Sequence, residues 1–157
     1  MEGLLLSVHV LAAIVFVGGS AVATSLFPRY APVAVGVPAT GGEGGTGGEG
    51  ERSRSVAVAL HRISRGYAVA GLVVPVAGIV LAIVQGRMGE IWINVSMVLT
   101  IFAGGLLALQ ILPLQRDALA EPGPRDRLRR LSMFAGIYNL LWAIVVVLMI
   151  VRPGADS

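Results

Sequence analysis

The sequence contains no cysteine and no lysine, and it has few charged residues of any kind. Without cysteine, the chain cannot form disulfides, thiolate metal sites or a cysteine nucleophile. Only 13% of its 157 residues are charged, whereas about 25% is usual in a soluble domain. So little charge cannot cover the surface of a water-soluble globule, and the composition therefore predicts an integral membrane protein.

The basic residues are all arginine, twelve of them, and they give a net charge of +3. In a soluble protein the isoelectric point near 10.2 would indicate nucleic-acid binding. In a membrane protein the same excess reports topology and contact with anionic lipid. We therefore expect lipid partners and no nucleic acid.

Four stretches without Asp, Glu or Arg are long enough to cross about 30 Å of hydrocarbon as helices. In lipid every backbone N–H and C=O must be paired internally, and runs of this length without two-residue alternation are helices. The predicted fold class is all-α, a polytopic four-helix transmembrane bundle. The spans run over Leu4–Leu26, Gly66–Gln85, Ile91–Leu114 and Leu131–Val151.

Orientation follows from the arginines, because ten of the twelve lie in the two loops that join spans one to two and three to four. Basic loops stay in the cytoplasm. The sequence thus predicts a multi-pass protein of a bacterial cytoplasmic (inner) membrane with both termini outside the cytoplasm.

The chain is expected to form one membrane domain over residues 1–157. A flexible glycine-rich cytoplasmic loop is predicted at about 36–55, since seven of the ten residues of Gly41–Gly50 are glycine. That tract lacks the Gly-Lys-Ser/Thr ending of a phosphate-binding loop. Pro75 is expected to kink span two near Gly71, because it removes a backbone donor.

A weak internal similarity relates the two halves. Phe16–Gly19 resembles Phe102–Gly105, and Arg62–Ser64 resembles Arg130–Ser132, each pair at equivalent points of the spans. Two hairpins of the same orientation would form a tandem repeat. Chance similarity in an apolar, glycine-rich chain stays open as the alternative.

Helix contacts in lipid depend on small residues that let backbones approach closely. Four pairs of small residues stand four positions apart, one pair in each of spans one and three and two pairs in span two. They are expected to form seams of the bundle or contacts with other subunits. The pairs are Gly19/Ala23, Gly66/Ala70, Gly78/Ala82 and Gly104/Ala108.

No span contains a charged residue, which argues against a proton relay, a voltage sensor or an ion-coupled transporter. His9 is the most informative intramembrane polar residue. It is either a haem or metal ligand or a buried histidine hydrogen-bonded to a neighbour. Asn94 and Ser96 enter span three from the same side and are candidate neighbours. The residues alone favour the hydrogen-bonded histidine.

His61 lies on the cytoplasmic approach to span two, nearly a membrane thickness from His9. Together with four arginines it is interpreted as a cluster at the lipid-headgroup interface. No catalytic motif is present, so no residue is assigned to catalysis or to a metal site. The arginines are Arg62, Arg65, Arg129 and Arg130.

Three segments resemble the CopD-like and HemJ-like superfamily of small bacterial membrane proteins: His9–Gly19, Arg62–Arg65 and Leu148–Gly154. The resemblance implies a four-helix membrane fold, and for HemJ-like members a protoporphyrinogen oxidase with haem b, for which His9 would be the first-helix axial ligand. In those members the third helix reads Trp-x-His-Val-Lys. Here Asn94 and Ser96 stand in place of that histidine and lysine.

Two functions are therefore expected from the sequence. The first is a non-catalytic accessory or stabilising subunit of a larger cytoplasmic-membrane complex, respiratory or transport-related, that contacts other integral membrane subunits and carries no cofactor. The alternative is a membrane redox protein that binds haem b through His9.

Overall fold

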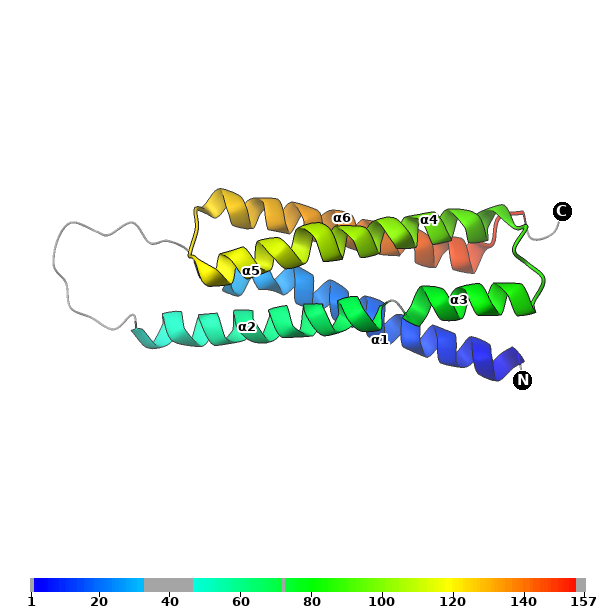
Figure 1. The fold of residues 1–157 in the computed structure, drawn as a ribbon, viewed down its shortest axis with the longest axis horizontal. Coiled ribbons are helices and arrows are strands. Elements are labelled where there is room, and N and C mark those ends of the chain that lie inside the picture. The colour runs from blue at the N-terminus through cyan, green and yellow to red at the C-terminus, as the bar shows by residue number, and fades with distance from the viewer. Residues whose placement is uncertain (1, 33–46, 72, 155–157) are drawn as a thin grey trace.

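The computed structural model describes residues 2–32, 47–71 and 73–154. In this part of the chain all regular elements are helical (Figure 1). The helices are α1 (Glu2–Tyr30), α2 (Gly47–Ala70), α3 (Val73–Val84), α4 (Ile91–Leu106), the π-helical turn η1 (Leu107–Ile111), α5 (Leu112–Ala120) and α6 (Arg125–Val151).

Four helical segments of the described chain are long and apolar enough to cross a membrane, which confirms the all-helical class and agrees with the four expected spans in length and composition. They are longer than the sequence indicated, because helix continues past the uncharged stretches: Leu6–Tyr30, Ser53–Val84, Ile91–Ala120 and Arg125–Val151. Arginine does not stop a helix, since its helix propensity is close to that of leucine.

The glycine-rich loop expected at 36–55 is shorter than predicted, because α2 already begins at Gly47. The remainder of that expectation, 36–46, lies outside the described residues. Helix α2 ends at Ala70 and α3 begins at Val73, and residue 72 between them lies outside the described residues, so the kink expected from Pro75 stays a prediction. The Gly71 N–H still donates to the Tyr67 carbonyl at 2.7 Å.

A second irregularity lies in the third span, where the backbone widens into the π-helical turn η1. Pro113 follows at the start of α5 and has no N–H to give to the carbonyl four residues earlier. A widened turn before proline relieves the clash between its ring and that carbonyl.

The helices lie lengthwise side by side, and both chain ends lie at the same end of the bundle (Figure 1). Helix α1 packs against α2 and α6, α4 packs against α6, and α2 packs against α5. The buried core, which includes Phe27, Ile111 and Leu131, lies toward the opposite, arginine-rich end. Toward the termini the apolar side chains point outward, as in Leu11 and Ile150.

Candidate functional site

His9 lies on the first half of α1 and faces α3. A Cβ atom added at Gly78 would lie 3.7 Å from His9 Cε1, so the imidazole packs over the space that this glycine leaves. The ring is half-buried. Among the described residues neither ring nitrogen has a hydrogen bond, so the geometry alone does not make His9 a satisfied core histidine.

The structure does not join His9 to its two candidate neighbours by hydrogen bonds. The Asn94 amide instead donates to the Met88 and Glu90 carbonyls, at 3.3 Å in both cases. Ser96 is buried on α4, and its Oγ has no hydrogen-bond partner. The three residues therefore form no hydrogen-bonded site in the described structure.

The donor set does not fit a haem held by two histidines. His61 precedes Gly78, the residue beside His9, by seventeen positions, which is about 25 Å along a helix. Nor does the described part of the chain bring three or more His, Asp or Glu side chains together around a common point. If the chain binds haem, His9 would therefore be its single histidine ligand.

A buried polar network joins α2 to α5, and the sequence reasoning missed it. His61 Nδ1 lies 3.0 Å from Gln115 Oε1, and Gln115 Nε2 lies 3.5 Å from Ser64 Oγ. Gln115 and Ser64 are both fully buried. Because the amide oxygen only accepts, His61 donates from Nδ1.

Gln115 lies just beyond the third span as the sequence predicts it, Ile91–Leu114, because that uncharged run ends before Arg116. Its spacing could have revealed it, since Ala103, Leu107, Ile111 and Gln115 recur every four residues along one helix face. The expectation for His61 needs refinement, because its ring points toward α5. Its four arginine partners in the expected interface cluster, Arg62, Arg65, Arg129 and Arg130, are exposed.

Two hydrogen bonds join α1 to α6 in the same way. Ser20 Oγ and Tyr138 Oη lie 2.8 Å apart, and Asn139 Nδ2 donates to Ser25 Oγ at 2.8 Å. In lipid such bonds between helices contribute roughly 0.6–2 kcal/mol each. They fix the rotation of α6 on α1.

The four small-residue pairs divide into two groups. Gly19/Ala23 and Gly78/Ala82 face other helices of the bundle: the Tyr67 ring covers Gly19, and Ala23 and Ala82 are buried. Gly66 and Gly104 are exposed with no atom within 4 Å of an added Cβ. The pairs Gly66/Ala70 and Gly104/Ala108 are thus not close-packed at their glycines in the single chain.

Gln110 lies in the π-helical turn of the third span, and its polar side chain is exposed. Its amide makes no hydrogen bond with any described residue. Leu109, next to it, is 73% exposed. The turn that precedes Pro113 therefore presents an unpaired amide on an otherwise apolar outer surface.

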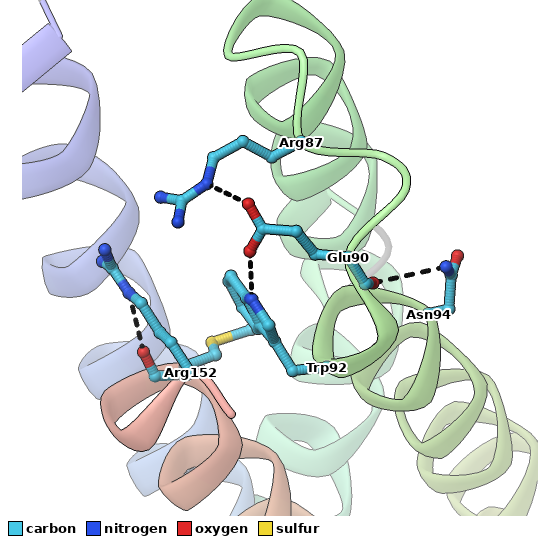
Figure 2. Close-up of polar contacts among 6 residues, drawn as sticks. Arg87, Glu90, Trp92, Asn94 and Arg152 are labelled. Atoms are coloured by element: carbon cyan, nitrogen blue, oxygen red, sulfur yellow. Dashed lines mark hydrogen bonds and ion pairs between the residues drawn. The ribbon is translucent and has the colours of Figure 1, made fainter. Parts of the chain in front are cut away.

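A polar cluster of Arg87, Glu90, Trp92 and Arg152 lies where the turn before α4 meets the end of α6 (Figure 2). Glu90 accepts from Arg87 Nε at 2.5 Å and from the Trp92 indole N–H. The Arg87 and Arg152 guanidinium carbons each lie 5.9 Å from the centre of the Trp92 ring. The hydrogen bond from Arg87 is the main reason that the pKa of Glu90 lies below its ordinary value, while burial opposes this shift.

No protein-family profile, curated protein or solved structure matches this chain.

Proposed function

We propose that this protein is a non-catalytic accessory subunit that packs, within a cytoplasmic membrane, against a larger respiratory or transport complex. The observation that carries the proposal is the exposed, unpaired amide of Gln110 on the third span. A polar side chain at this depth is suited to a contact with another transmembrane helix.

The depth of Gln110 follows from the nearest charge on the same helix. Arg116 stands six residues further along, which is about 9 Å of helix rise. If Arg116 lies in the headgroup layer, the Gln110 amide lies in hydrocarbon. An amide in an apolar medium without a hydrogen bond costs roughly 2–7 kcal/mol, so a partner group that pairs with it stabilises the inserted state.

The open small-residue pairs support the same proposal. Gly104 and Ala108 precede Gln110 on the same span, and Gly66 and Ala70 lie on the second span. Both glycines are exposed without a close neighbour. In membranes, surfaces of this kind let a second helix approach closely without a clash.

Capture from native membranes tests the proposal. After extraction in a gentle detergent, mass spectrometry should find a stoichiometric integral membrane partner with the tagged chain. Gln110→Leu should reduce the recovery of that partner about fivefold or more, because ~1 kcal/mol of hydrogen bonding is lost. Leu109→Ala is the matched control and should retain the partner, and a wild-type chain recovered as a strict monomer overturns the proposal.

Haem binding through His9 is the competing hypothesis, and a spectrum separates the two. We expect no Soret absorbance from the purified protein, even after haem is supplied during expression. If a Soret band appears and His9→Ala removes it, the protein binds haem through His9 and the accessory role without a cofactor is wrong.

A further inference from the structure

A groove of about 300 Å³ runs along the outer surface of the seam between α1 and α2. Gly18, Gly19 and Val22 line it from α1, and Leu60, Ile63 and Tyr67 line it from α2. Gly18, Val22 and Ile63 are exposed, so the groove opens toward the surroundings of the bundle.

The shape of the groove depends on two side-chain features. No atom lies within 4 Å of a Cβ added at Gly18, so the missing side chain at this position leaves open space. The Tyr67 ring forms one wall above Gly19, and it is held in place by an edge-on contact with Phe16 at 6.0 Å between ring centres. The groove is therefore apolar and partly preformed.

A positive charge lies beyond one end of the groove. Gly18, Val22 and Arg29 stand at spacings of four and seven residues, which places them along one face of α1. Arg29 follows Val22 by about 10 Å of helix rise and is exposed. Among the residues whose side chains the structure describes, which do not include 47–52, the ion pair is Arg87–Glu90, and Arg29 takes part in none.

We propose that this groove holds one acyl chain of an anionic phospholipid whose phosphate binds Arg29. The inference rests on the proposed insertion of the four helices into a membrane, but it does not need the protein partner proposed above. Lipid tails are as apolar as the groove, so the chain gains little from burial itself. The specific contribution comes from the guanidinium, which supplies matched donors to the phosphate. The preference for an anionic lipid arises because its headgroup carries no cationic group that offsets the phosphate charge.

Photolabelling in lipid nanodiscs tests the proposal with a defined probe. The purified chain is placed in phosphatidylcholine nanodiscs that contain a phosphatidylglycerol with a diazirine on one acyl chain, or the phosphatidylcholine analogue with the same chain. Peptide mapping should place the adducts near Gly18–Val22 and Ile63–Tyr67. The phosphatidylglycerol probe should label about fivefold more than the phosphatidylcholine probe, as ~1 kcal/mol of attraction between one arginine and a headgroup of net negative charge implies.

Two variants and a control separate the groove from the rest of the surface. Gly18→Leu fills the open space and should remove the adducts at both segments, and Arg29→Gln should abolish the preference for the anionic probe. Gly104→Leu adds the same side chain at another exposed glycine without close neighbours and should leave the labelling unchanged. Each variant must unfold at or above the midpoint of the wild type, since replacing a helical glycine can itself stabilise the helix.

Unchanged labelling of Gly18→Leu, or labelling spread evenly over all exposed spans, overturns the lipid site. The site is also overturned if Gly18→Leu instead releases a bound protein or converts a dimer to a monomer while labelling persists. Partner capture through Gln110 is measured separately, and resistance to alkaline extraction reports insertion. Failure of the lipid site is therefore distinguishable from failure of the proposed function.

Discussion

At the scale of single residues, Gly19 is where the α1–α2 seam is closest. A methyl group there would overlap the Tyr67 hydroxyl and ring. Its neighbour Gly18 has open space instead. These two adjacent glycines therefore differ in role. Gly19 lets α1 and α2 approach closely, and Gly18 leaves the open space of the groove.

We expect Gly19→Ala to lower the free energy of unfolding by about 1 kcal/mol, the lower end of overpacking effects, because the Tyr67 ring can partly swing away. Gly18→Ala is the control, and it should be neutral or stabilising because alanine favours helix. Thermal unfolding in detergent measures both variants. Equal midpoints for the two would contradict close packing at Gly19.

At the scale of elements, the His61–Gln115–Ser64 network joins the first hairpin to the second. We expect Gln115→Leu to destabilise the fold by about 1 kcal/mol, since it leaves the His61 and Ser64 side chains without their partner. Chemical unfolding in micelles measures the change, with Gln110→Leu as the control because that amide makes no hydrogen bond with any described residue. A neutral effect of Gln115→Leu would show that the network does not stabilise the α2–α5 contact.

The Glu90 cluster connects the turn before α4 to the end of α6, and it predicts a pH effect. The pKa of Glu90 in the folded chain lies below its ordinary value of 4.5. The stabilisation is therefore complete above pH 4.5 and is lost as the pH falls through the lower pKa of the folded state. Tryptophan fluorescence should change only below pH 4.5.

Glu90→Gln is the control for that titration, because the glutamine cannot ionise and the acid transition should disappear. Trp142 contributes the same background signal to both proteins. If the fluorescence transition of the wild type has its midpoint at or above pH 4.5, the proposed effect of Arg87 on the pKa of Glu90 is contradicted.

At the scale of the whole molecule, the two termini share one end of the bundle (Figure 1). Reporters fused to either terminus should therefore report the same side of the membrane, and the arginine distribution predicts the outer side. Termini on opposite sides would contradict the fold. Two cytoplasmic termini would contradict only the charge-based orientation.

The sequence by itself determined that the chain is helical and that four apolar segments can each cross a membrane. The scarcity of charge and the length of the uncharged runs leave no other way to pair the backbone in lipid. The kink expected near Gly71 rests on reasoning of the same local kind, because Pro75 removes a backbone donor whatever its surroundings.

Only the tertiary structure decided which polar and small residues meet. Gln115 belongs to a buried network because α5 continues beyond the uncharged span and packs against α2. The Tyr67 ring packs over Gly19, whereas no described residue packs over Gly104. This difference depends on how the helices rotate and cross in the folded bundle. These contacts join residues more than forty positions apart, as in Ser20 with Tyr138. The local pattern can place Gln115 on a buried helix face, but it does not identify the residues that the side chain meets.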